Sequence, residues 1–131
     1  MANSNPMRTP LKNTRGLGSA HEGADHFWKQ RVTGVANLVL SIFLVGLLVT
    51  LAGHDHSVVR KTLSSPLVAL PLLLLIISGL VHMRLGMQTI IEDYVPSEGT
   101  KVVLLMLNTF FAIAVGAASI FAVLKLSLVG A

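Results

Sequence analysis

The chain has 131 residues, of which 53% are hydrophobic and only 12% are charged. This composition is too apolar for an ordinary soluble domain of that length, and three membrane-crossing segments would leave no room for a separate catalytic domain. The sequence contains no cysteine, which excludes disulfides, cysteine-ligated zinc, iron–sulfur ligation and thioether-attached haem, so any redox centre needs histidine, methionine or non-covalent binding.

The N-terminal segment, residues 1–30, is polar and is expected to lie in the cytoplasm. Five of the ten Lys and Arg residues precede the first apolar run: Arg8, Lys12, Arg15, Lys29 and Arg31. Basic residues beside membrane spans stay on the cytoplasmic side, which predicts a multi-pass protein of the bacterial inner membrane with a cytoplasmic N-terminus. The mitochondrial inner membrane is the alternative. Because the net charge of +4 reflects this topology signal, it does not indicate nucleic-acid binding.

Residues 31–131 contain three long apolar runs and predict an all-α membrane protein. Each run has about the 20 residues that a helix needs to cross a hydrocarbon layer of about 30 Å. No run shows the ten-residue alternation of a transmembrane β-barrel, so helices are the expected spanning form. The predicted spans are residues 33–51, 66–91 and 101–126, joined by loops at 52–65 and 92–100.

The second span carries a stripe of small and polar residues in an otherwise apolar helix. Its members recur at helical spacing: Ser78, His82, Gly86, Thr89 and Asp93. Steps of three and four residues keep them on one helix face for about four turns. Polar side chains within a membrane point at protein, cofactor or water, so this face is expected to look inward.

His82 is the one histidine inside a predicted span, about nine residues or ~14 Å from the end of that span. A neutral imidazole at this depth needs a partner for each ring nitrogen, either a metal ion or a hydrogen bond to a neighbouring helix. Gly86, one turn further on, leaves space for a flat group such as a porphyrin or for a close helix crossing. Arg84 points roughly the opposite way, and either snorkels towards the membrane surface or reaches an anionic group.

The other two spans carry faces of small residues that predict close helix packing. These faces are formed by Gly34, Asn37 and Ser41 in the first span and by Asn108, Ala112, Gly116 and Ser119 in the third. The first loop holds His54 and His56, which we expect to be solvated rather than bound to a metal.

At the cytoplasmic boundary, Trp28 and Tyr94 suit interfacial anchoring. Asp93 and Tyr94 add a carboxylate beside a phenol, which can donate a hydrogen bond and deliver protons to a carbonyl oxygen of a ligand. Arg31 lies on the same side and can supply positive charge to an anionic group.

The stretch His82 to Tyr94, His-Met-Arg-Leu-Gly-Met-Gln-Thr-Ile-Ile-Glu-Asp-Tyr, resembles the smaller hydrophobic membrane anchor subunit of succinate dehydrogenase (respiratory complex II). The pattern of that family is a histidine, a glycine four residues later, and Asp-Tyr at eleven and twelve residues. His82, Gly86, Asp93 and Tyr94 fit this pattern without a gap. The segment from Gly18 to Gly34 is also similar, and the three-span layout extends the resemblance from about Gly16 to the C-terminus.

The resemblance implies specific roles for these residues. His82 would be one axial ligand of the iron of a b-type haem. Tyr94 would hydrogen-bond ubiquinone, supported by Asp93, which could also assist proton delivery. Arg31 would lie near the quinone or the haem propionates.

The resemblance also implies partners within an enzyme of the tricarboxylic acid cycle and respiratory chain. A second hydrophobic anchor subunit would supply the other haem ligand and complete a helical bundle of which this chain forms half. A flavoprotein subunit would oxidise succinate, and an iron–sulfur subunit would pass the electrons to quinone, so this chain would perform no dicarboxylate chemistry itself. A fumarate reductase anchor would serve the reverse reaction.

Two other classes of function compete with this interpretation. The polar stripe could serve only to pack helices in a non-haem structural or assembly subunit. Alternatively, His82 and Asp93 could act as relay groups in a small proton-path transporter subunit.

Overall fold

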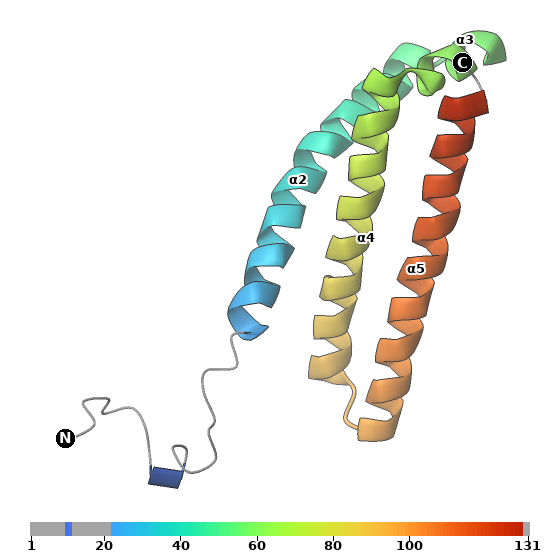
Figure 1. Ribbon diagram of the computed structural model, residues 1–131. Coiled ribbons are helices and arrows are strands. Elements are labelled where there is room, and N and C mark those ends of the chain that lie inside the picture. The colour runs from blue at the N-terminus through green and yellow to red at the C-terminus, as the bar shows by residue number, and fades with distance from the viewer. Residues whose placement is uncertain (1–9, 12–21, 130–131) are drawn as a thin grey trace.

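In the computed structural model, residues 22–129 form four helices, and the structure describes these residues together with residues 10–11. Three helices are long: α2 (Glu22–Leu51), α4 (Pro66–Tyr94) and α5 (Glu98–Val129). One is short, α3 (His56–Ser64). Every element in the described part of the chain is therefore helical, as predicted (Figure 1). The basic residues Arg8, Lys12 and Arg15 lie outside the described residues.

The three long helices are each long and apolar enough to cross a membrane. Each predicted span lies within one of them, but the helices continue further at their ends. Helix α2 already begins at Glu22, so the last residues of the polar N-terminal segment belong to the same helix as the first span. An ion pair between Lys29 and Asp25, one turn apart, supports these polar turns.

The first connecting segment was expected to be a loop, but most of it forms α3. Gly53 makes the preceding turn with a φ of 81°, a conformation that favours glycine. The backbone carbonyl of Asp55 then accepts hydrogen bonds from the N–H groups of Val58 and Val59, which begins the helix. Pro66 follows α3 and stands in the first turn of α4, where its missing N–H costs no hydrogen bond.

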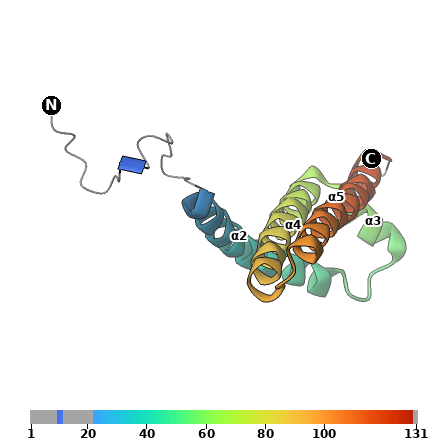
Figure 2. The same cartoon turned by 90° about the horizontal axis from the view of Figure 1, so that it is seen from below.

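Helix α4 is the central element of the bundle. It packs against α2 on one side and α5 on another (Figures 1 and 2). Consecutive long helices run in opposite directions, so the start of α2, the end of α4 and the start of α5 share one end, which we call the Tyr94 end. Helix α3 lies crosswise at the opposite end, which we call the α3 end, and it contacts α4 and α5.

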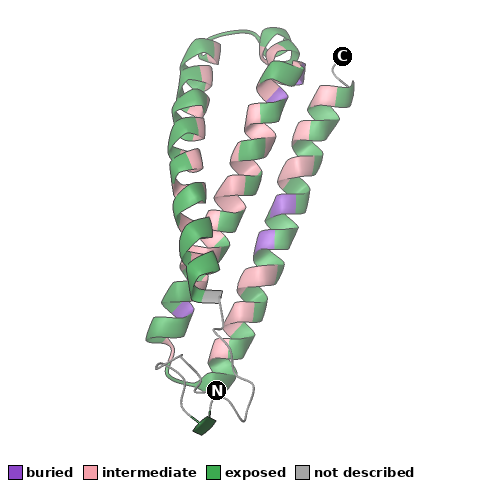
Figure 3. Cartoon of the chain, turned by 60° about the vertical axis from the view of Figure 1, so that its left-hand side comes forward, coloured by how far each residue is buried: buried purple, intermediate pink, exposed green. Residues whose placement is uncertain are grey.

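Few side chains are buried within the chain. Large apolar side chains along all three long helices remain exposed, and buried positions are scarce (Figure 3). In a soluble protein such surfaces would be unfavourable, whereas in a membrane lipid or another protein covers them. The chain is therefore a thin three-helix layer whose apolar faces remain for lipid or another protein to cover.

Helices α4 and α5 approach closely along the predicted small-residue face of α5. Ala112 is only 8% exposed, and a Cβ atom at Gly116 would lie 2.8 Å from Leu80 Cδ1. Asn108 Nδ2 donates a hydrogen bond of 2.9 Å to the backbone carbonyl of Arg84, which joins the helices further along. This face packs helices, as the spacing predicted.

Replacing Gly116 with leucine is expected to destabilise the bundle, because the new side chain would have to displace Leu80 at the closest point of α4 and α5. Overpacking of this kind costs about 1–3 kcal/mol. Gly46→Leu is the matched control, since a Cβ atom there meets nothing within 4 Å. The measurement is the melting temperature of the purified protein in detergent, and equal melting temperatures for the two variants would contradict the packing argument.

Candidate functional site

The polar stripe of α4 faces α2. Ser78 Oγ donates a hydrogen bond of 3.3 Å to the backbone carbonyl of Thr33. One turn along α4, His82 contacts α2, and Gly86 lies against the side chain of Gln30 another turn on. The prediction that this face looks inward is confirmed for these residues.

The imidazole of His82 is held by its Nδ1 atom. This nitrogen lies 3.1 Å from the backbone carbonyl oxygen of Gln30 and 3.1 Å from Thr33 Oγ1. A carbonyl can only accept, so Nδ1 carries the ring proton and donates it. The Thr33 hydroxyl is itself a donor to the carbonyl of Lys29, at 2.7 Å, which leaves its oxygen lone pair for Nδ1–H.

This arrangement determines the tautomer of His82. With the proton on Nδ1, the other ring nitrogen, Nε2, carries a lone pair and can bind a metal ion. No residue within 10–11 or 22–129 forms a hydrogen bond with Nε2. The side chain is half-buried, so the chain itself satisfies one ring nitrogen and leaves the other for a group from outside.

Two glycines allow α2 and α4 to approach closely here, Gly34 against the imidazole and Gly86 against the side chain of Gln30. A Cβ atom at Gly34 would lie 3.3 Å from His82 Cε1, and one at Gly86 would lie 3.3 Å from Gln30 Nε2. Gly34, which belongs to the face of α2 that was predicted to pack helices, therefore contacts the imidazole of His82. The sequence analysis did not identify Gln30 and Thr33 as the residues that hydrogen-bond the imidazole of His82. The one feature that pointed to them was their spacing of one helical turn next to Gly34.

The same region of α2 carries polar atoms without partners. His26 Nε2, Gln30 Oε1 and Asn37 Oδ1 are buried and have no hydrogen-bond partner among the described residues. Buried polar atoms are nearly always paired in folded proteins, so this face requires water or a group from another molecule. Ser41, predicted to share the face of Asn37, is exposed.

Arg31 lies between two hollows at the Tyr94 end. Its guanidinium carbon stands 3.5 Å from the centre of the Phe27 ring, a cation–π contact. One hollow, of about 410 Å³, is lined by Gly23, His26, Phe27, Gln30, Arg31 and Thr89. The other, of about 400 Å³, is lined by Trp28, Arg31, Val32 and Val35. Both hollows are shallow and open at the surface.

Asp93 and Tyr94 close α4 at the same end of the bundle as Arg31, as predicted. Both side chains are exposed, Tyr94 to 81%. Within the described residues, no hydrogen bond or ion pair holds either side chain, and neither lines a hollow together with Arg31. The structure thus gathers the three residues at one end of the bundle without bringing them into contact.

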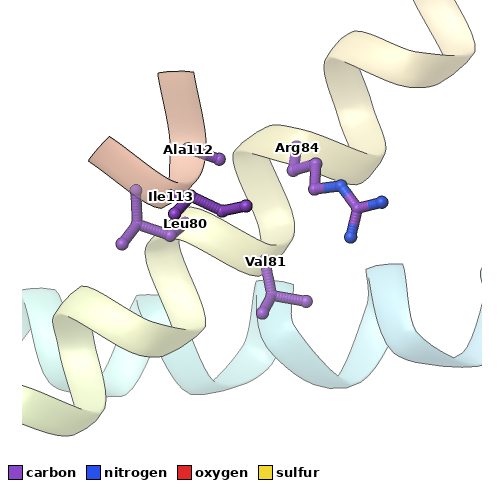
Figure 4. A pocket seen from close by; sticks show the side chains of 5 residues that line it. All are labelled: Leu80, Val81, Arg84, Ala112 and Ile113. Carbon is purple, nitrogen blue, oxygen red and sulfur yellow. The ribbon is translucent and has the colours of Figure 1, made fainter. Parts of the chain in front are cut away.

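Arg84 lies on the side of α4 that faces α5, whereas His82 faces α2. A cavity of about 160 Å³ is lined by Leu80, Val81, Arg84, Ala112 and Ile113 (Figure 4). The guanidinium points away from Ala112 and Ile113, out of this cavity. The opposite directions of the two side chains agree with the spacing of the sequence.

His54 and His56 are both exposed at the α3 end. Across the described part of the chain, no group of three or more His, Cys, Asp or Glu side chains could hold a metal ion. These two histidines therefore do not belong to such a cluster.

Comparison with known proteins assigns the family. Residues 5–124 match the succinate dehydrogenase/fumarate reductase transmembrane subunit family. The chain is 33% identical over 120 residues to a succinate dehydrogenase hydrophobic membrane anchor subunit of Paracoccus denitrificans, covering 92% of each chain. It is 30% identical over 107 residues to the subunit of the same name from Rickettsia bellii, covering 82% of this chain and 86% of the relative. The chain therefore belongs to the family of succinate dehydrogenase/fumarate reductase transmembrane subunits, as the resemblance of its His82-to-Tyr94 stretch predicted.

Proposed function

We propose that this chain is the subunit of the succinate dehydrogenase anchor that ligates haem b through His82 and forms part of the ubiquinone-reduction site. The observation that carries the proposal is the hydrogen bonding of His82 Nδ1 to α2. Its Nδ1–H is fixed by the backbone carbonyl of Gln30, which leaves Nε2 free towards a metal ion. A histidine that only packed helices would have no need of an unoccupied nitrogen at this depth.

The residues of this chain fit one side of a haem. Nε2 of His82 offers a neutral nitrogen donor to the iron, oriented by the hydrogen bonds at Nδ1. Gly34 lets the edge of the imidazole pack closely on α2, since a Cβ atom there would lie 3.3 Å from His82 Cε1. Among the described residues, His82 is the one histidine in the middle of a long helix, so a second ligand would come from a partner. When bound, haem b supplies one-electron transfer chemistry.

The quinone roles fall to residues at the Tyr94 end. The exposed phenol of Tyr94 donates a hydrogen bond to a carbonyl oxygen of ubiquinone, and Asp93 supports that phenol or receives protons from the aqueous side. Arg31 offers positive charge to the quinone or to a haem propionate from its position between the two hollows. Because these side chains do not meet within the chain, the site is completed by other subunits.

The proposed assembly follows from the exposed faces. A second hydrophobic anchor subunit supplies the other haem ligand and covers apolar faces of α2, α4 and α5, while lipid covers the rest. The iron–sulfur subunit docks at the Tyr94 end, and the flavoprotein subunit binds to it. The N-terminus faces the cytoplasm of a bacterial inner membrane, so the Tyr94 end is cytoplasmic.

Purification of the whole membrane complex tests this proposal. We expect a reducible b-type haem spectrum, together with electron transfer from succinate to ubiquinone. A complex that reduces quinone without containing haem would reject the ligand role of His82 and favour a structural subunit. A chain that purifies alone and moves protons would favour the relay alternative.

Replacing Thr33 with valine is expected to raise the midpoint potential of the haem by about 40 mV. The hydroxyl oxygen accepts part of the hydrogen bond from Nδ1, and a hydrogen bond of about 1 kcal/mol corresponds to a shift of this size for one electron. A weaker hydrogen bond makes the imidazole a poorer electron donor, which favours ferrous iron. Thr50→Val is the matched control, since the Thr50 hydroxyl donates to the carbonyl of Leu47 in the last turn of α2, away from His82. A potential unchanged in Thr33→Val would contradict the contact.

A further inference from the structure

One exposed face of α4 carries a second polar row that the proposed function does not use. Arg84, Gln88 and Glu92 follow one another at steps of four residues, and Val81 precedes Arg84 by three, so the four share one helix face, which we call the Arg84 face. Gln88 Nε2 donates a hydrogen bond of 2.8 Å to Glu92 Oε1. Val81, Arg84 and Glu92 are exposed, so α2 and α5 leave most of this face uncovered.

The guanidinium of Arg84 is available to another molecule. Arg84 stands at the edge of the contact between α4 and α5, where its backbone carbonyl accepts the hydrogen bond from Asn108. Its side chain extends outward from that contact (Figure 4). Among residues 10–11 and 22–129, the guanidinium has no hydrogen-bond, ion-pair or aromatic partner.

Arg84 lies within the membrane-spanning part of α4 rather than at its end. It precedes Tyr94, the last residue of α4, by ten residues, or about 15 Å at the helical rise. It also lies about 10 Å inside the predicted end of the span at residue 91. Charged side chains at such depth are rare and are usually paired, because hydrocarbon solvates them poorly. An anionic group is therefore expected beside Arg84.

Neither a second copy of this chain nor the proposed haem supplies that anion. Copies related by rotation about the membrane normal hold the same residues at the same depth, and a two-fold axis beside this face would oppose two arginines. Under the proposed function, the haem lies on the side of His82, roughly 200° around α4 from Arg84. All six acidic residues of the sequence lie outside the predicted spans: Glu22, Asp25, Asp55, Glu92, Asp93 and Glu98.

A lipid phosphate suits the Arg84 face less well than a carboxylate of another protein. The Cα–Cβ bond of a helical residue tilts towards the helix N-terminus, which for α4 is the α3 end, so Arg84 starts away from the headgroups nearest to it. Gln88 and Glu92 stand between Arg84 and those headgroups. Lipid over this face would leave the Gln88 amide against acyl chains and the Glu92 carboxylate beside the phosphates.

We propose that the Arg84 face receives a transmembrane helix of another membrane subunit, and that a carboxylate of this helix pairs with Arg84 inside the bilayer. The planar guanidinium can donate to both oxygens of a carboxylate, which a lysine cannot do. The proposal rests on the proposed function in requiring assembly with other membrane subunits, but it does not depend on haem ligation or quinone binding.

The strength of subunit association tests the ion pair. Arg84→Gln would leave the carboxylate of the partner without its cation, and we expect the affinity of this chain for the rest of the complex to fall about 30-fold or more. The substitution makes α4 less costly to insert, so failed insertion does not explain such a loss. Arg84→Lys should recover part of the affinity, because it keeps the charge.

Lys101→Gln is the matched control for Arg84→Gln. Lys101 Nζ is already paired with Glu98 Oε1 of the same chain, at 3.2 Å, and exposed pairs of this kind contribute little. The control should change the affinity by no more than a few-fold. The measurement is the fraction of this subunit that stays with the purified complex on serial dilution in mild detergent.

Photocrosslinking in the purified complex identifies the occupant. A photoreactive phenylalanine derivative in place of Val81, one turn from Arg84 on the same face, should capture a transmembrane peptide of another subunit. We expect that peptide to contain Asp or Glu. Replacing this acid with its amide should weaken association as much as Arg84→Gln does, and combining the two changes should weaken it little further, because the pair is already broken.

Four outcomes would overturn the proposal. They are retention of the Arg84→Gln subunit at the wild-type level, capture of phospholipid or of a second copy at position 81, capture of a peptide without an acidic residue, and full additivity of the two substitutions. The haem spectrum of the same wild-type preparation tests the proposed function separately. A complex without haem would reject the ligand role of His82 and leave the association and crosslinking results as they are.

Discussion

Replacing His82 with alanine is expected to remove the b-type haem band from the purified complex. In the proposed function Nε2 of His82 binds the iron, and its orientation depends on the hydrogen bonds of Nδ1 to Gln30 and Thr33. Loss of a group that merely orients a metal ligand costs about 10- to 100-fold in metal affinity. Loss of the ligand itself is expected to cost more, leaving less than a tenth of the haem per complex.

The measurement is a reduced-minus-oxidised absorption spectrum, scaled to the flavin content of the same preparation. His54→Ala provides the control, because His54 is exposed at the α3 end, in the turn between α2 and α3. That variant should keep its full haem content. A wild-type spectrum retained in His82→Ala would contradict ligation by His82 and would leave helix packing as the role of the stripe.

The parts of the fold that the sequence predicted are those that the membrane itself determines. A long apolar run in a bilayer can satisfy its backbone only as a helix, so the three spans were readable from composition and length. The spacing of Ser78, His82 and Gly86 likewise identified the inward face of α4, because helical periodicity leaves one choice of face.

Helix α3 was missed because its signal is local and short. Nine residues give little more than two turns, and the polar run from Gly53 to His56 resembles an ordinary turn. Its stability comes instead from packing on α4 and α5, which only the tertiary arrangement reveals. The same arrangement creates a hollow of about 410 Å³ between α3 and the last turns of α5, whose lining residues are far apart in the sequence.

The candidate site was likewise predicted only in part from the sequence. His82, Gly86, Asp93 and Tyr94 could be identified from their spacing, but the groups that hold the imidazole could not. One of them is the backbone carbonyl of Gln30, which has no side-chain signature, and the choice of α2 over α5 as the facing helix depends on packing. Under the proposed function, the second haem ligand and the remainder of the quinone site belong to other chains, so this sequence carries no signal for them.

Replacing Tyr94 with phenylalanine is expected to lower the rate of quinone reduction by about 100-fold or more, while succinate oxidation with a soluble artificial acceptor continues at the wild-type rate. Phenylalanine keeps the aromatic ring that anchors the end of α4 at the interface, so only the hydroxyl is lost. A positioned proton donor contributes about 10²- to 10⁴-fold to a reaction that protonates the substrate. The two assays on one preparation therefore separate the quinone step from dicarboxylate chemistry.

A structural role for Tyr94 predicts a different pattern. An aromatic anchor that only positions α4 would tolerate phenylalanine, and both activities would stay close to wild type. Trp28→Phe tests that role independently, because Trp28 is also an exposed aromatic residue at the Tyr94 end, 66% accessible, and should affect quinone reduction by no more than a few-fold. Equal loss of both activities in Tyr94→Phe would indicate failed assembly and contradict the quinone role. Selective loss of quinone reduction would mean that the Tyr94 phenol, which is exposed when this chain is considered by itself, contacts the quinone in the assembled complex.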